Sequence, residues 1–135
     1  MFYNCQKLHT ILGFEGTEYA DIDTSEMFVN CKEITKLPSK FGSDKMNNWN
    51  AMHMCNGCVK LTNIHKNTNH VTNASYMYAN SGIKEVKVNE DICWDISDAS
   101  NMFENCDKLY AFEVKENYYE RFSDTVSETK PYTMI

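Results

Sequence analysis

The chain spells one short phrase five times, and this repetition constrains its fold more than any other feature. Full copies read MFYNCQKL at residues 1–8, MFVNCKEI at 27–34, MCNGCVKL at 54–61 and MFENCDKL at 102–109, and a shorter copy, MYANSGI, occupies 77–83. The leading residues of the copies, called marker methionines below, are Met1, Met27, Met54, Met77 and Met102. Their intervals of 26, 27, 23 and 25 residues fall within the range of about 20–50 that is typical of stacked repeats. The sequence therefore predicts one repeat unit per copy across residues 1–114.

A short helix is predicted around each marker methionine. Four residues earlier stands a residue that favours a helix N-cap: Asp23, Asn50, Asn73 or Asp98. Small or apolar residues three before the marker, at it, one after it and four after it have the i, i+3, i+4, i+7 spacing of one helical face. Residues that tolerate a left-handed backbone follow at the third position after the marker: Asn4, Asn30, Gly57, Asn80 and Asn105. Each helix should therefore end after about two turns.

A short strand is predicted after each helix. The apolar pairs are Leu8 and Ile11, Ile34 and Leu37, Leu61 and Ile64, Ile83 and Val86, and Leu109 and Phe112. In two repeats the alternation continues through Val88 and Val114, which is the period of a strand. The expected fold is an α/β solenoid: a short, right-handed, leucine-rich-repeat-like coil of about five repeats with one parallel sheet. Residues 1–114 would form the solenoid, with the first coil truncated, and residues 115–135 a C-terminal cap containing Tyr118, Tyr119, Phe122 and Val126 at helix-like spacing.

Residues 94–109, WDISDASNMFENCDKL, carry a resemblance to a known family. The segment resembles the repeat of the BspA-like leucine-rich-repeat surface proteins, which reads approximately Trp-Asp-x-Ser, a spacer, Met-Phe-x-x-Cys and Leu-x-x-Leu. The likeness covers about residues 1–114, although Trp94 alone stands at the tryptophan position and its spacer is short. The resemblance implies a leucine-rich-repeat solenoid used for adhesion or protein interaction, with no catalytic residues.

Composition narrows the function further. The net charge of −6, from 13 basic and 19 acidic residues, gives no electrostatic support for nucleic-acid binding. No apolar run approaches the ~18 residues of a membrane span, so membrane insertion is not expected. The first residues, MFYNCQKLHTILGFEG, lack the positively charged start of a signal peptide. The sequence leaves the localisation unknown, and a cell surface or a virion fits only as part of an assembly.

A metal or redox site has one weak candidate, His53, Cys55 and Cys58 in HMCNGC. A Cys-x-x-Cys pair suits zinc or a disulfide, but the alternative of buried thiols is favoured because both cysteines occupy inward positions of the repeat. We expect a core ladder of Met27, Met54, Met77, Met102, Cys5, Cys31, Cys58 and Cys106, with the cysteines reduced. No cofactor is expected. No catalytic triad, phosphate loop or carboxylate pair is recognisable, so the chain is not expected to be an enzyme.

Two surfaces are predicted to bind partners. The first coil lacks a cap, so Met1, Phe2 and Leu8 are expected to dock on a second copy or a larger assembly, unless Met1 and Phe2 fold inward. The second surface is the solvent face of the predicted sheet: His9, Thr10, Thr35, Lys36, Thr62, Asn63, Lys84, Glu85 and Tyr110. The function is expected to be non-enzymatic protein–protein interaction or adhesion. The alternative is a structural subunit of a larger assembly, such as a phage or virus particle, that docks through its open N-terminal coil.

Overall fold

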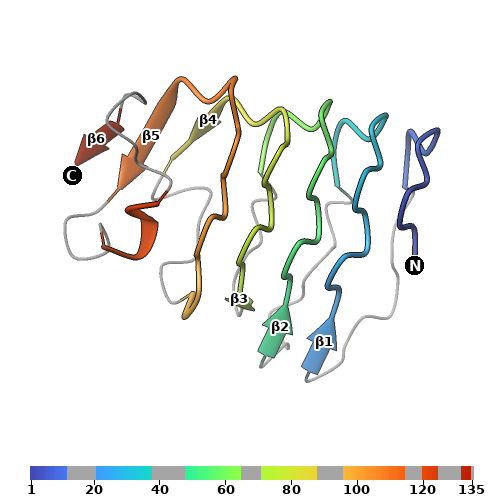
Figure 1. Cartoon of the computed structure of the whole chain (residues 1–135), viewed down its shortest axis with the longest axis horizontal. Helices are drawn as coiled ribbons and strands as arrows, with labels where there is room; N and C mark the ends of the chain where they lie inside the picture. The colour runs from blue at the N-terminus through green and yellow to red at the C-terminus, as the bar shows by residue number, and fades with distance from the viewer. Residues whose placement is uncertain are drawn as a thin grey trace.

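Two small parallel sheets and a row of stacked turns make up the protein (Figure 1). The computed structural model describes residues 1–11, 21–37, 48–64, 71–87, 96–114, 120–124 and 132–134. The first sheet contains β1 (Asp21–Asp23), β2 (Asn48–Asn50) and β3 (Val71–Asn73) in that order. The second contains β4 (Glu85–Val86), β5 (Ala111–Val114) and β6 (Tyr132–Met134). Successive copies of the phrase lie side by side in chain order, and the second sheet lies at the C-terminal end of the row.

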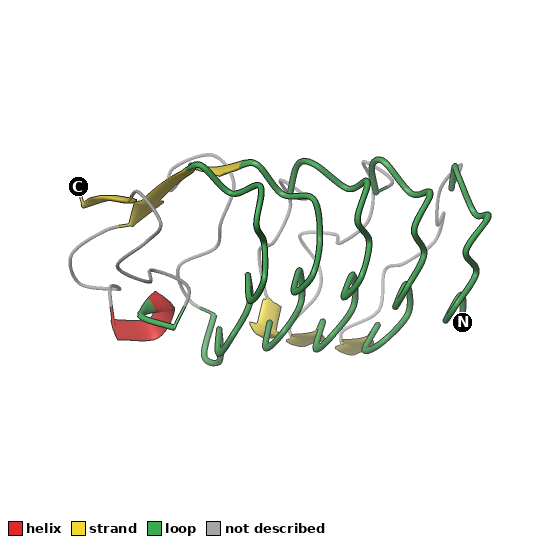
Figure 2. Ribbon diagram, turned by 45° about the horizontal axis from the view of Figure 1, so that its top comes forward, coloured by secondary structure: helices red, strands yellow, loops and turns green. Residues whose placement is uncertain are grey.

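Tight turns, not helices, form the segments around the marker methionines. These turn segments are residues 1–5, 24–31, 51–58, 74–81 and 99–106 (Figure 2). In the second repeat, the Met27 amide donates to the Thr24 carbonyl at 3.0 Å and the Cys31 amide to the Phe28 carbonyl at 3.1 Å. These bonds span three residues, whereas an α-helix closes over four. The third residue of each such turn has a positive φ, 57° at Glu26 and 58° at Asn30, and that conformation interrupts a helix.

Backbone hydrogen bonds between neighbouring turn segments all run in one direction. Thr24, Glu26, Phe28 and Asn30 donate their amides to carbonyls of the third repeat, at 2.8–2.9 Å. The third repeat donates to the fourth, and the fourth to the fifth, through the equivalent four amides. Phe2 and Asn4 donate from the first repeat to Met27 and Val29 of the second. Each turn segment is therefore held by the carbonyls of the repeat that follows it.

The predicted α/β leucine-rich-repeat solenoid is wrong. The described residues contain no α-helix, only a 3-10 turn at residues 120–122. They form two three-stranded sheets instead of one continuous sheet, and their strands do not close into the coils of a solenoid. The physical reason is the left-handed residue before each marker from Met27 onward, for example His53 at φ 55° and Tyr76 at φ 54°, whose amides donate to the next repeat.

The predicted strand positions are correct only for the last two repeats. β4 and β5 include Val86 and Phe112, which were expected in strands. The corresponding segments 8–11, 34–37 and 61–64 are not strands. In the second, third and fourth repeats the strands β1, β2 and β3 lie just before the turn segment, and each ends on the residue predicted as a helix N-cap.

The core runs through the middle of the stack and contains most of the predicted ladder residues, although Met27 is only half-buried. Met54, Met77 and Met102 are fully buried, as are the ladder cysteines Cys31, Cys58 and Cys106. The first repeat differs, because Met1 is 85% exposed and Cys5 is also exposed. Phe122 is buried against Phe112 at the last repeat, with ring centroids 5.8 Å apart. The other predicted cap residues Tyr118, Tyr119 and Val126 lie outside the described residues.

Thr24 replaces the alanine of the other full-length turn segments because Trp49 needs a hydrogen-bond acceptor. The Trp49 ring is fully buried, and its Nε1 donates to Thr24 Oγ1 at 2.8 Å. A buried donor that loses its acceptor costs about 1–3 kcal/mol. Thr24→Val should therefore lower the free energy of unfolding by about 1–2 kcal/mol in urea titration, whereas Thr24→Ser should lose less. A valine variant as stable as the parent chain would contradict this role.

Candidate docking surfaces

In the part of the chain that the structure describes, the first repeat forms one edge of the stack. Phe2 stacks on Phe28 of the second repeat, with ring centroids 5.6 Å apart and an interplanar angle of 1°. Phe2 and Leu8 are only half-buried, whereas their equivalents Phe28 and Ile34 are fully buried. Tyr3 is 53% exposed. We call residues 1–8 the first-repeat edge; it brings together the predicted docking residues Met1, Phe2 and Leu8.

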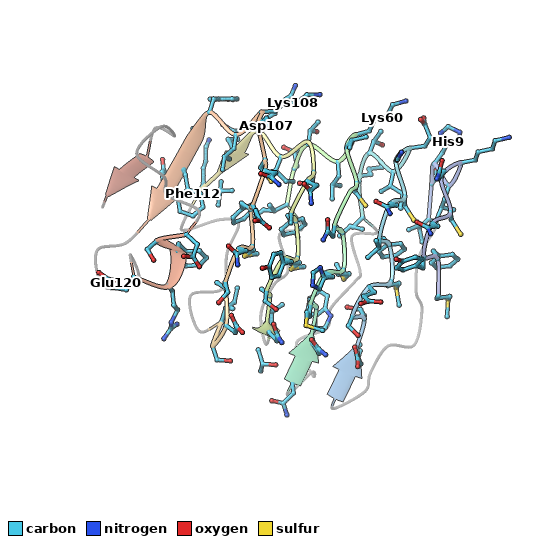
Figure 3. All side chains as sticks on the ribbon, in the orientation of Figure 1. His9, Lys60, Asp107, Lys108, Phe112 and Glu120 are labelled. Carbon is cyan, nitrogen blue, oxygen red and sulfur yellow. The ribbon has the colours of Figure 1, made fainter. Side chains whose placement is uncertain are left out.

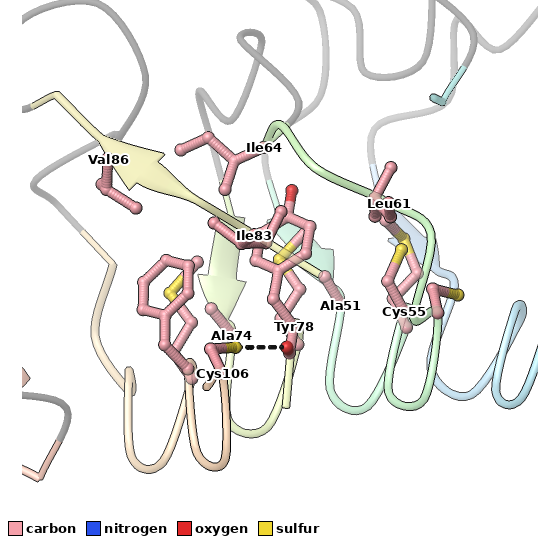
Figure 4. Close-up of a cluster of buried hydrophobic side chains, with 14 of the residues drawn as sticks. Ala51, Cys55, Leu61, Ile64, Ala74, Tyr78, Ile83, Val86 and Cys106 are labelled. Atoms are coloured by element: carbon pink, nitrogen blue, oxygen red, sulfur yellow. Dashed lines mark hydrogen bonds between the residues drawn. The ribbon is translucent and has the colours of Figure 1, made fainter. Parts of the chain in front are cut away.

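The ladder cysteines donate hydrogen bonds between repeats. The Sγ atoms of Cys31, Cys58 and Cys106 lie 2.9, 3.1 and 3.1 Å from the carbonyl oxygens of Phe2, Phe28 and Tyr78. Figure 4 shows the last of these bonds inside the core. Each thiol thus reaches back to the aromatic position of the preceding repeat. The sequence pattern predicted the packing of these cysteines but not this bond. Cys5 occupies the same position at the first-repeat edge.

Asparagine side chains form a second ladder on the surface of the turns. Asn30 Nδ2 donates to Asn4 Oδ1 at 3.0 Å, and Asn105 Nδ2 donates to Asn80 Oδ1 at 3.2 Å. Asn80 donates to Asn56 at 2.9 Å, because the third repeat has Gly57 at the usual ladder position. The left-handed backbone explains asparagine at most of these positions. The side-chain ladder is a second reason, which sequence reasoning missed.

Two backbone carbonyls of the first-repeat edge accept no hydrogen bond from the described residues. In the next repeat, the carbonyls of Met27 and Val29 accept the amides of Phe2 and Asn4 at 2.9 and 2.8 Å. The equivalent carbonyls at the edge belong to Met1 and Tyr3, and they accept no bond from the described chain. The edge also presents two donors, the side-chain amide of Asn4 and the thiol of Cys5.

The predicted sheet-face residues lie on one margin of the stack, although only Glu85 belongs to β4 and the others lie outside strands. They are exposed or half-exposed: His9, Thr10, Thr35, Lys36, Thr62, Asn63, Lys84, Glu85 and Tyr110. The Lys84 amide donates to the Thr62 carbonyl at 3.2 Å, and the Tyr110 amide to the Lys84 carbonyl at 2.9 Å, so three repeats are in register here. Tyr110 is 58% exposed, and its hydroxyl donates to Glu85 at 3.3 Å.

The candidate metal site is not assembled. Cys55 and Cys58 are fully buried, and the Cys58 amide donates to the Cys55 carbonyl across a tight turn. Burial raises the pKa of the Cys55 thiol, while a hydrogen bond from Cys55 lowers the pKa of Cys58. His53 instead contacts Asn56 at 2.9 Å and stacks on Tyr76 with centroids 4.7 Å apart. No cluster of three or more potential metal-ligating side chains occurs among the described residues.

The five described cysteines are thiols: Cys5, Cys31, Cys55, Cys58 and Cys106. Burial raises the pKa of the Cys31 thiol to about 11. The thiol therefore stays protonated at neutral pH and can donate its hydrogen bond to the Phe2 carbonyl. Cys31 is therefore a neutral donor that joins the first two repeats.

Comparisons with known protein families, with curated proteins and with solved structures found no match to this chain. The resemblance to BspA-like repeats rests on the sequence phrase alone, and the leucine-rich-repeat solenoid that it implies is not what the turn segments form. The described part of the chain contains no helix that is long and apolar enough to cross a bilayer.

Proposed function

We propose that this chain is a non-enzymatic protein-interaction module that docks through its first-repeat edge. The observation that carries the proposal is the set of hydrogen-bonding groups left over at this edge, where the carbonyls of Met1 and Tyr3 lie beside the donors of Asn4 and Cys5. Exposed Met1 and half-buried Phe2 add apolar surface next to them. An edge with unpaired backbone groups and apolar side chains favours association.

A second copy of the chain is the partner that this edge fits. The edge carries both acceptors and donors, so a copy related by a two-fold axis can satisfy the Met1 and Tyr3 carbonyls with Asn4 and Cys5. Stacking on the last repeat fits less well, because Phe122 already covers that end of the core and is 1% exposed. A dimerising unit of this kind would suit a structural subunit of a larger assembly.

Blocking Cys5 tests the proposal. With Cys93 replaced by serine, a maleimide-linked polyethylene glycol should attach at Cys5, since the other described thiols are buried. Light scattering over a range of concentrations should show a dimer for the unmodified chain and a monomer for the modified one. The matched control carries Cys5→Ser and Ser100→Cys, and the same label at this exposed site should leave the dimer intact. A monomer before labelling, or a dimer that persists with label on Cys5, contradicts the proposal.

A further inference from the structure

Charged side chains are segregated between the two margins of the stack. The segments that follow the turn segments, residues 6–11, 32–37, 59–64, 82–87 and 107–113, contain seven lysines and four acidic residues. We call the seven lysines the basic rim: Lys7, Lys32, Lys36, Lys60, Lys84, Lys87 and Lys108. The opposite margin, residues 21–31, 48–58, 71–81 and 96–106, contains five acidic residues and neither lysine nor arginine. A chain of net charge −6 thus concentrates all its described lysines on one side.

The basic rim is exposed along the whole stack. All seven lysines are solvent-exposed, and every repeat contributes at least one of them. Figure 3 shows Lys60 and Lys108 on the same margin as His9, away from β1 and β2. Lys60 donates a hydrogen bond to a carboxylate, since its Nζ lies 2.6 Å from Glu33 Oε2. That hydrogen bond lowers the pKa of the Glu33 carboxyl.

Five of the rim lysines have no acidic partner among the described residues of the chain. They are Lys7, Lys32, Lys36, Lys84 and Lys108. The threonine hydroxyls of Thr10, Thr35 and Thr62 lie on the same margin and can donate to an anion. Cations recurring from repeat to repeat, with small donors between them, match an elongated ligand that carries several carboxylates.

We propose that the basic rim binds a short acidic segment of another polypeptide in an extended conformation. Adjacent repeats lie about 4.8 Å apart, so five repeats span about 20 Å. An extended chain rises about 3.3 Å per residue, so about six residues cover the rim. A long polyanion such as a nucleic acid fits less well, because its charge continues past the rim toward the acidic side of a protein with net charge −6.

Electrostatic attraction at the rim acts locally. The screening length is about 8 Å at physiological salt, so a ligand on the rim responds to the lysines beside it more than to the acidic margin across the core. The surface is separate from the first-repeat edge except for Lys7, and the proposal does not require the chain to dimerise.

Fluorescence anisotropy with a labelled peptide of about eight residues alternating Glu and Ser tests the proposal. The peptide should bind the full-length chain, the Gln-Ser counterpart should not, and raising the salt about sixfold should weaken binding about tenfold. Lys36→Gln with Lys84→Gln should weaken binding about fivefold, since exposed ion pairs each contribute modestly. Replacing all five unpaired lysines by glutamine should abolish it.

The matched control adds the same negative charge to the other margin. Ser25→Glu with Ser100→Glu changes the net charge by as much as the double lysine variant and should leave the affinity within twofold of the parent chain. Circular dichroism confirms the fold of each variant. The proposal is overturned if the peptide does not bind, if the two double variants weaken it equally, or if an oligonucleotide of equal charge binds more tightly. Dimerisation through the first-repeat edge is tested separately, by labelling Cys5. A negative result for peptide binding therefore leaves the dimer proposal untouched, and the reverse also holds.

Discussion

Gly82→Ala should lower the free energy of unfolding by about 3 kcal/mol, the upper part of the range for overpacked sites. An added Cβ would lie 2.3 Å from the carbonyl oxygen of Val59 and 3.1 Å from that of Leu61. Both atoms belong to the backbone of the preceding repeat, which cannot move aside as a side chain can. Gly82 lies where the fourth copy of the phrase is one residue shorter than the others, and the two backbones approach closely there.

Gly57→Ala is the matched control for this prediction. Its added Cβ also meets an atom at 2.3 Å, but that atom is the side-chain Oδ1 of Asn30, which can rotate away. The positive φ of 83° adds a cost of about 1 kcal/mol for a residue with a Cβ. Urea titration should therefore rank Gly82→Ala as the more destabilising variant. Asn30→Ala should recover part of the loss at Gly57 and none at Gly82, and equal losses at the two glycines would contradict the assignment.

Met77→Ala should cost about 3 kcal/mol, because a fully buried methionine leaves a cavity when it is truncated. Met77 lies in the fourth repeat, with stacked neighbours on both sides, so the surrounding turns have little freedom to collapse. Thermal and urea unfolding followed by circular dichroism would measure the effect.

Met1→Ala is the internal control, because Met1 occupies the same position of the phrase and is 85% exposed. Its replacement should change the free energy of unfolding by no more than about 0.5 kcal/mol. Comparing the losses in the free energy of unfolding for Met77→Ala and Met1→Ala therefore shows whether burial, and not the position in the phrase, determines the cost. Similar losses for the two variants at low protein concentration would show that Met1 is packed inside the free chain.

The sequence predicted the core better than it predicted the backbone. Met54, Met77 and Met102 were expected inside and are fully buried, because apolar residues at a fixed place in every repeat have to meet when repeats stack. The helix prediction failed because the residues on which it rested occur in tight turns as well as at helix ends. Asp23 Oδ1 accepts the Ser25 amide at 2.8 Å, which is how an N-cap begins a helix and also how an Asx turn forms.

The feature that decides between helix and turn is not local. Glu26 and Tyr76 adopt positive φ although such residue types seldom do so, and no propensity points to it. Their conformation is held by amide bonds to a repeat more than twenty residues further along the chain. A pattern that considers one repeat at a time contains no information on these bonds.

For the docking surfaces, the sequence predicted which side chains are exposed but not which hydrogen-bonding groups they present. Tyr110 is exposed because of its position within the repeat, whereas Met1 is exposed because it lies in the first repeat, at a position that is buried in the last three repeats. The donor roles of Asn4 and Cys5 could not be read from composition, since they follow from what Asn30 and Cys31 do one repeat later. The proposed metal ligand His53 was close to the thiols in sequence only, because its ring packs against Tyr76 on the surface of the turns.

The one-way hydrogen bonds of the turn segments give the stack an electrostatic polarity. In the second, third and fourth repeats, four backbone amides of each turn segment, beginning with Thr24, Ala51 or Ala74, donate to the following repeat. The peptide dipoles of these segments therefore add, as they do in an α-helix. Ordinary sheets have little net dipole. The carbonyl end, which is negative, lies at the first repeat, which contains Lys7, and the amide end, which is positive, lies at the last repeat, which contains Asp98 and Glu104. Each end of the stack thus carries side-chain charges that its own backbone field stabilises.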